Sequence, residues 1–316
     1  MKKFLKISAT TIISLIILLI VSEIYLRYKG LGNPIIYKKD LNFGYLPYEN
    51  QQVSRFKDSK ITINNNNFRV FEENNYINKI YFLGDSVTYG GSYIDDKNLF
   101  SSKVCINLNL NYSIKFDCLN GGVNAYGFEN IIKRLKFLNY NKNDFIVVTL
   151  ILGNFYRNFI QIESLPYFTK TNDHLFKANI ELFSFLIDKI RNKLRFKSNL
   201  RNFEKKENLD ILKIKIKNDF KLLKEFLDSN SNILIFFSPS KNFYENKNEF
   251  IMEKYLFDTY KNNTNIFALN DFVKNKEYKK IFYDNIHLNN YGHKIYSDII
   301  SNIIIEKIKE WGNVFF

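Results

Sequence analysis

The sequence lacks several residue types and motifs that would place it in a well-known class. Its 316 residues include only two cysteines, and two cysteines alone do not make a zinc site. Neither Gly-x-x-x-x-Gly-Lys nor Gly-x-Gly-x-x-Gly occurs, so nucleotide binding has no support. Gly-x-Ser-x-Gly is also missing, which argues against the α/β-hydrolase fold. His287 and His293 do not have the spacing of a zinc motif such as His-Glu-x-x-His. We therefore expect neither a metal nor a cofactor.

Acidic residues are too few to balance the basic ones, and the formal net charge is +14. A basic protein can favour nucleic acid or an anionic membrane surface. The lysines are nevertheless spread along the chain, and no recognised nucleic-acid motif accompanies them. Apolar residues make up 46% of the chain and aromatic residues 17%, which is enough for a buried core. We expect a folded protein without a nucleic-acid partner.

Long apolar runs are also scarce, since only the N-terminus has one. Residues 7–21 carry no charge and follow Lys2, Lys3 and Lys6. Extended to Leu26, the run reaches about the 20 residues that a bilayer needs. No small-x-small cleavage pattern follows, which favours an uncleaved anchor over a signal peptide. The lysines should stay cytoplasmic. We predict a single-pass protein of the inner (cytoplasmic) membrane, with its main domain on the periplasmic or extracellular side.

The rest of the chain divides into two regions after this anchor, which takes residues 1–29. Residues 30–78 are polar and Asn-rich, and we expect an extended arm with a hairpin or two that wraps the main domain, 79–316. Alternating strands and helices in that domain predict a parallel sheet covered on both faces. The predicted strands are 79–83, 113–119, 144–152, 232–238 and 265–269, and the predicted helices are about 97–110, 127–140, 208–229 and 289–310.

An insertion at about 155–207 interrupts this alternation. It contains Pro166, His174, a predicted helix over 176–196 and basic segments around 191–201. Two interpretations stay open. The insertion is either a lid or substrate-binding cap, or a solvated amphipathic helix packed on the edge of the domain. His174 is expected to be a surface residue.

A serine at a strand-to-helix turn is the main sign of chemistry. Gly84-Asp85-Ser86 ends a predicted strand, and Asp284 and His287 lie near the other end of the chain. Serine is a poor nucleophile until a base removes its proton. A histidine can do so, and a carboxylate holds that histidine in the right tautomer. Ser86, His287 and Asp284 supply these parts. Asp85 is expected to shape the turn and cap backbone donors.

The same rim of the sheet carries further candidates, because ligands bind beyond the carboxyl ends of parallel strands. Gly122 and Asn154 follow two other predicted strands. The tetrahedral intermediate of acyl transfer needs hydrogen-bond donors aimed at its oxyanion. We predict that the backbone N–H groups of Ser86 and Gly122 and the side-chain amide of Asn154 form this oxyanion hole.

These motifs resemble the SGNH (GDSL-type) hydrolases. The resemblance is carried by four blocks in family order over about 79–300: Gly84-Asp-Ser-Val-Thr-Tyr-Gly90, Asn120-Gly-Gly-Val-Asn-Ala-Tyr-Gly127, Leu152-Gly-Asn154 and Asp284-Asn-Ile-His287. It implies a flavodoxin-like three-layer α/β/α fold, ester hydrolysis without a cofactor, and Gly122 as the oxyanion glycine.

Two positions depart from the family pattern. The third block usually reads Gly-x-Asn-Asp, but here Phe155 follows Asn154 and the glycine directly precedes it. This shift puts the register of the amide donor in question, with Asn158 as a substitute. Leu288 stands where proline is common after the histidine.

The two cysteines, Cys105 and Cys118, are predicted on a helix and a strand that pack together. An oxidising location permits a disulfide between them, and two separate buried thiols are the alternative.

The leading hypothesis is a membrane-anchored serine esterase that acts on O-acyl, especially O-acetyl, groups of an envelope carbohydrate or lipid. One alternative keeps the site but transfers the acyl group to a glycan hydroxyl. The other is a non-catalytic module that binds envelope glycans.

Overall fold

The computed structural model describes residues 2–162, 175–187, 190, 206–229, 232–245, 251–260, 263–273 and 277–315. Pro166, His174 and the basic segments around 191–201, singled out in the sequence, lie outside the described residues. Of the predicted helix 176–196, the described stretch 177–187 is helical.

A parallel sheet of five strands forms the centre of the main domain, in the order β6-β5-β7-β8-β9. The strands are β5 (Asn78–Gly84), β6 (Phe116–Gly122), β7 (Phe145–Leu150), β8 (Ile233–Phe237) and β9 (Ile266–Ala268). β8 is a continuous apolar run, and β7 is apolar except for Thr149, because both faces of these strands are buried. This order is the flavodoxin-like one, and it confirms the predicted fold class.

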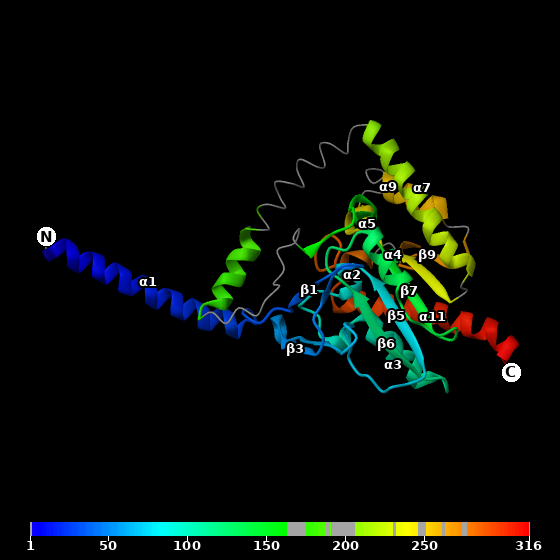
Figure 1. Ribbon diagram of the computed structural model, residues 1–316, viewed down its shortest axis with the longest axis horizontal. Coiled ribbons are helices and arrows are strands. Elements are labelled where there is room, and N and C mark those ends of the chain that lie inside the picture. The colour runs from blue at the N-terminus through cyan, green and yellow to red at the C-terminus, as the bar shows by residue number, and fades with distance from the viewer. Residues whose placement is uncertain are drawn as a thin grey trace.

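Helices cover both faces of the sheet (Figure 1). On one face α3 (Phe100–Asn111) and α11 (Asn290–Phe315) share a core with Phe82 of β5. On the other face α4 (Phe128–Lys136), α7 (Lys206–Ser229) and α9 (Ile251–Tyr260) share a core with Leu83. Successive strand residues point to opposite faces, so one strand supports both layers.

Short helices lie between these elements, several of them at the carboxyl ends of strands. They are α2 (Ser86–Tyr89), α5 (Leu152–Tyr156), α8 (Lys241–Glu245), α10 (Tyr278–Ile281) and the 3₁₀ turns η1 (Phe56–Asp58), η2 (Asp96–Asn98) and η4 (Leu269–Asp271).

The arm before the sheet contains two antiparallel hairpins, as the sequence predicts. β1 (Tyr37–Asp40) pairs with β2 (Gly44–Pro47), and β3 (Gln51–Ser54) pairs with β4 (Lys60–Ile63). At the end of the arm, Arg69 pairs with Asn120 at the sheet edge. Its buried guanidinium forms an ion pair with Asp96 at 2.7 Å and donates to the carbonyls of Tyr89 and Gly91. The arm therefore fixes the loop that follows α2.

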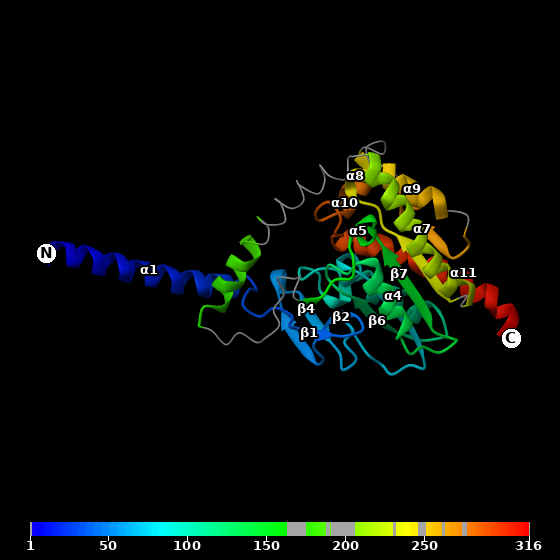
Figure 2. The ribbon, with the colours of Figure 1, turned by 45° about the horizontal axis from the view of Figure 1, so that its top comes forward.

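The N-terminal helix α1 (Lys2–Tyr28) projects away from the domain (Figures 1 and 2). Its stretch Ser8–Tyr28, 21 residues long, is apolar and long enough to cross a membrane. A signal sequence has the same length and composition, so this feature by itself indicates either a membrane anchor or a signal sequence.

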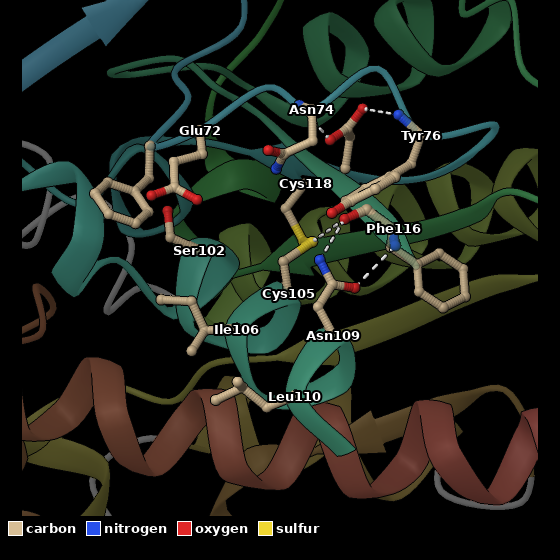
Figure 3. A pocket seen from close by; sticks show the side chains of 12 residues that line it. Glu72, Asn74, Tyr76, Ser102, Cys105, Ile106, Asn109, Leu110, Phe116 and Cys118 are labelled. Atoms are coloured by element: carbon tan, nitrogen blue, oxygen red, sulfur yellow. Dashed lines mark hydrogen bonds between the residues drawn. A yellow bond between two sulfur atoms is a disulfide. The ribbon is translucent and has the colours of Figure 1, made fainter. Parts of the chain in front are cut away.

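Cys105 of α3 and Cys118 of β6 form a disulfide, with their Cα atoms 5.8 Å apart. The alternative of two separate thiols is therefore wrong. Figure 3 shows the bridge among the side chains that line a hollow between α3 and the segment 71–76. The volume of this hollow is about 320 Å³. This hollow lies along the first half of β6, away from the carboxyl ends of the strands where the predicted site residues lie.

Candidate active site

The turn from β5 into α2 places Ser86 at the carboxyl end of a central strand. Gly84 is required there, because a Cβ would lie 2.1 Å from Thr88 Oγ1 and 2.7 Å from the Thr149 carbonyl oxygen. The Asp85 carboxylate is fully buried and accepts the N–H of Val87 at 3.0 Å, which caps α2. The predicted capping role of Asp85 matches this contact.

The structure brings Ser86, His287 and Asp284 together in one chain of hydrogen bonds. His287 Nε2 lies 2.9 Å from Ser86 Oγ, and His287 Nδ1 lies 2.7 Å from Asp284 Oδ2. A proton on Nδ1, donated to the carboxylate, leaves Nε2 free to accept the serine proton. The geometry therefore suits removal of the hydroxyl proton by the imidazole.

The segment from Asp284 to His287 folds on itself. Asp284 Oδ1 accepts the backbone N–H groups of Ile286 at 2.9 Å and His287 at 2.8 Å. Partial burial acts to raise the pKa of Asp284, but the hydrogen bonds from His287 and Ile286 outweigh it and lower this pKa to about 2. The carboxylate is therefore ionised at neutral pH, as an orienting partner of His287 must be.

Two neighbouring elements hold this segment in place. The ring of Tyr93 stacks on Tyr283 at 4.1 Å, and its hydroxyl donates to the Leu288 carbonyl at 3.1 Å. On the other side, the N–H of Lys241 in α8 donates to the Asn285 carbonyl at 2.7 Å. The histidine is therefore braced from both the α2 side and the α8 side.

Comparison with known proteins finds similarity in the fold. A variant of an acetyl xylan esterase from Geobacillus stearothermophilus matches with 14% identity and a TM-score of 0.43, over 72% of this chain and 95% of that one. A protein described as lipolytic and of the G-D-S-L family, from Desulfitobacterium hafniense, matches with 12% identity and a TM-score of 0.35, over 71% and 98%. No protein-family model and no curated protein matches the sequence. At these identities and TM-scores, any role for the site has to rest on the geometry of its own residues.

Gly122 does not offer the free N–H that the predicted oxyanion hole needs. Its N–H donates to Asn120 Oδ1 at 2.9 Å, and it has only one hydrogen to give. A Cβ at this position would lie 2.2 Å from the Tyr89 nitrogen. The Asn120 amide in turn donates to the Thr88 carbonyl at 2.7 Å. Gly122 is thus a close-packing position that lets β6 approach α2.

Asn154 is buried, but only one of its two amide hydrogens is used, so its role as an oxyanion donor stays a prediction. Its residue exposure is 0%, its Nδ2 donates to the Tyr126 carbonyl at 2.9 Å, and its Oδ1 accepts the Ile151 N–H at 2.7 Å. The side chain therefore closes the start of α5 and ties it to the loop after β6. The substitute, Asn158, is exposed in the loop after α5.

Two other rim residues were not singled out in the sequence. Ala125 follows β6 with a left-handed φ of 63°, in a half-exposed turn. Arg157 lies 3.0 Å from Asp85 Oδ2 and 3.2 Å from the Tyr126 carbonyl, with its side chain 29% exposed. The sequence predicts neither role. Alanine does not indicate a left-handed turn, and a single arginine does not stand out in a chain with many basic residues.

Glu253 of α9 is a third residue that sequence reasoning missed. It accepts the Ser240 N–H and hydroxyl, each at 3.2 Å, just before α8. Burial raises the pKa of Glu253 to about 7, against the opposing effect of these two hydrogen bonds. Because α8 contacts Asn285, Glu253 supports the segment that carries His287.

His293 is part of the packing and not of the hydrogen-bond chain. It is fully buried in α11, and its Nδ1 accepts the Phe100 N–H at 3.1 Å. Burial lowers the pKa of His293 to about 3, so the ring is neutral. Among the described residues, no cluster of three or more His, Cys, Asp or Glu side chains is arranged to hold a metal ion.

Proposed function

We propose that this protein is a serine esterase that hydrolyses O-acyl esters. The observation that carries the proposal is the chain of hydrogen bonds from Ser86 through His287 to Asp284. Ser86 Oγ attacks the acyl carbonyl while His287 Nε2 takes its proton, and the alcohol leaves with that proton. Water then attacks the acyl-serine and gives a proton to His287. The bond from Ser86 Oγ to the acyl carbon breaks, Ser86 Oγ takes that proton back from His287, and the carboxylic acid is released. Asp284 keeps the imidazole oriented and stabilises its charged form.

The oxyanion is stabilised in this proposal by two backbone N–H groups. Ser86 is the first residue of α2, so its N–H has no partner within the helix. We place the second donor in the backbone of the turn at Asn124 and Ala125, because this turn follows Gly122, which pairs in register with Gly84 just before the nucleophile. It replaces Gly122 in this role. Arg157 positions both loops, because it bonds to Asp85 beside the nucleophile and to Tyr126 beside that turn.

The substrate class in this proposal is an O-acyl, especially O-acetyl, ester of an envelope carbohydrate or lipid. Its basis is α1, taken as an uncleaved anchor that leaves the domain on the outer face of the cytoplasmic membrane. Contacts of α1 support retention. Glu23 accepts the N–H groups of Ala178 and Asn179, so the last turns of α1 are bonded to the helix at 177–187. Cleavage after the apolar run would remove these contacts.

Hydrolysis of p-nitrophenyl acetate by the full-length protein in detergent tests the mechanism. Ser86→Ala is expected to lower kcat/KM by about 10⁴-fold or more, because the nucleophile is lost. Ser54→Ala, at an exposed position of β3, is the matched control and should keep full activity. Turnover that persists in folded Ser86→Ala would refute the serine mechanism.

A fluorophosphonate probe tests whether the site is catalytic at all. The wild type should be labelled and Ser86→Ala should not. An unlabelled but folded wild type would favour the non-catalytic binding module. Adding a glycan acceptor and comparing acyl-glycan formation with free acetate release distinguishes acyl transfer from hydrolysis.

A further inference from the structure

The helix formed by residues 177–187 has its polar and apolar sides reversed relative to a helix on a water-soluble domain. Five of its large apolar side chains are exposed, Ile180 38%, Phe183 57%, Phe185 66%, Leu186 43% and Ile187 48%, and Leu182 is half-buried. Its polar residues Asn179 and Glu181 are buried instead, at 6% and 8% exposure. A surface helix in water normally buries its apolar stripe, so the outward face of this helix suits an apolar medium.

The polar side of this helix binds α1. Ser22 Oγ donates to Asn179 Oδ1 at 2.8 Å, and Asn179 Nδ2 donates to Glu23 at 2.9 Å. The same carboxylate accepts the backbone N–H groups of Ala178 at 3.0 Å and Asn179 at 2.9 Å. A carboxylate at a helix N-terminus satisfies unpaired N–H groups and interacts favourably with the helix dipole. This contact therefore explains why an acidic residue, Glu23, occurs in the largely apolar stretch of α1.

The arm holds the helix as well. Glu181 pairs with Arg55 and accepts the Gly32 N–H at 2.6 Å. The ion pair is largely buried, with side-chain exposures of 5% and 10%. Because Glu181 is bound to the arm and Asn179 to α1, the helix is fixed relative to both the candidate membrane span and the main domain.

The height of the helix along α1 is set by these contacts. They involve Ser22 and Glu23, within the last turns of the apolar stretch Ser8–Tyr28. In both views the first turn of the helix lies beside α1 near its domain end, and the helix is steeply inclined to α1 (Figures 1 and 2). Tyr25 and Tyr28, which follow Glu23 in α1, are exposed, and tyrosine favours the boundary between acyl chains and headgroups.

From this placement we propose that helix 177–187 is a membrane-binding element that lies in the interface of the bilayer, with its apolar face among the upper parts of the acyl chains. Interfacial helices of other proteins bind lipid in this orientation. The inference rests on α1 spanning the membrane, as in the proposed function. It gives the main domain a second attachment, which holds the site at a set orientation above the lipid surface and favours esters presented there.

Fluorescence quenching by brominated lipids tests the proposal in the full-length chain. Trp311, the single tryptophan, is first replaced by phenylalanine. Phe183→Trp then reports on the helix, in phosphatidylcholine vesicles whose acyl chains carry bromine near the headgroup or near the bilayer centre. We expect strong quenching, greatest with the shallow bromines. Phe272→Trp, an exposed position at the end of η4, is the matched control and should be unquenched.

A third reporter, Ile17→Trp in the middle of α1, separates failure of the anchor from failure of this inference. If Ile17→Trp is quenched by deep bromines and Phe183→Trp is not, the helix is not in the membrane and the proposal is wrong. A blue-shifted but unquenched Phe183→Trp signal would mean that protein covers this face, which also overturns it. If neither reporter is quenched, α1 does not span the membrane, and both the anchor and this inference are refuted. Turnover of p-nitrophenyl acetate in the same samples reports on the esterase independently.

Discussion

A serine hydroxyl needs a base at hydrogen-bond distance, and Ser86 takes its base from the far end of the chain. The separation of 201 residues between Ser86 and His287 is bridged by a contact of 2.9 Å. What keeps this contact in place is the self-bonded segment around Asp284 and the bracing by Tyr93 and Lys241. At this scale, the side chains that do not touch the reacting atoms decide whether the reacting ones are aligned.

Glu253 should make stability depend on pH. Its folded pKa of about 7 exceeds its ordinary value of 4.5, so the folded state retains a proton that the unfolded chain loses. The contribution of this proton to the free energy of unfolding is fully present below about pH 4.5. As the pH rises to about 7 this contribution is lost, and the free energy of unfolding falls by roughly 3 kcal/mol. Glu253→Gln cannot ionise and should lack this decline. Denaturant unfolding at pH 5 and pH 8 measures it.

The matched control for this measurement is Glu129→Gln, which changes an exposed side chain of α4 and should keep the decline of the wild type. Equal pH dependence in the wild type and in Glu253→Gln would show that the Glu253 carboxyl titrates normally.

Ala125 should be a strained residue whose relief does not harm activity. A left-handed φ of 63° is unfavourable for a residue with a Cβ. Ala125→Gly is therefore expected to be neutral to stabilising, by up to about 1 kcal/mol, with its backbone N–H still present. Thermal unfolding and p-nitrophenyl acetate turnover test this together. A large loss of turnover with unchanged stability would indicate that the alanine methyl itself shapes the site.

The sheet order explains why Ser86 lies where a ligand can bind. β5 has β6 on one side and β7 on the other, so the chain reverses its direction of travel across the sheet beside β5. Loops on the two sides of such a switch point separate and leave a crevice beyond the strand ends. The turn at Gly84 directs the nucleophile to this edge. There Asn120 of β6 bonds to Thr88 and Arg157 bonds to Asp85, while Asn154 joins the start of α5 to the loop after β6.

The disulfide between α3 and β6 should stabilise the domain without contributing to catalysis. Its loop of 13 residues predicts a contribution of about 3 kcal/mol from restriction of the unfolded chain. A double variant, Cys105→Ala with Cys118→Ala, should lose about this much stability and keep its kcat, because the bridge lies toward the start of β6 (Figure 3). Wild type treated with dithiothreitol should show the same loss. A loss of kcat in folded variant would link the bridge to the site.

In the whole molecule, the long apolar helix α1 forms hydrogen bonds with a later segment of the chain. Glu23, Ser22 and Arg27 of α1 all bond to residues 175–179, so the apolar segment and the folded part share polar contacts. A cleaved signal sequence has no need of such contacts, because it is removed before the mature protein functions.

Retention of α1 is therefore expected in cells. The mature protein should run at its full 37.7 kDa, sediment with membranes, and resist extraction by alkaline carbonate. A shortened product in the soluble fraction would contradict the anchor. A chain carrying an Ala-x-Ala sequence in place of residues 27–29 serves as the control for cleavage, since it supplies the processing pattern that the natural sequence lacks.

The sequence alone determined most of the strands, helices and layers of the main domain. The apolar runs of β5, β7 and β8 can be recognised in the sequence because a buried parallel strand is apolar on both faces. The alternation of strands with helices predicts the layers of the domain. Ser86, Asp284 and His287 were found because few residue types perform nucleophilic acyl chemistry, and the structure places them within hydrogen-bond reach.

The hydrogen-bond partners were decided only by the tertiary structure. Gly122 and Asn154 lie at the predicted rim, yet the Gly122 N–H is bonded to Asn120 and one Asn154 amide hydrogen to Tyr126, and no local pattern encodes such a pairing. The tertiary structure also decided the partners of Glu253 and those of the helix at 177–187, whose apolar side is exposed and whose polar side is buried. A sequence shows which groups a residue carries, whereas the group that satisfies each donor or acceptor depends on which distant segments the fold brings against it.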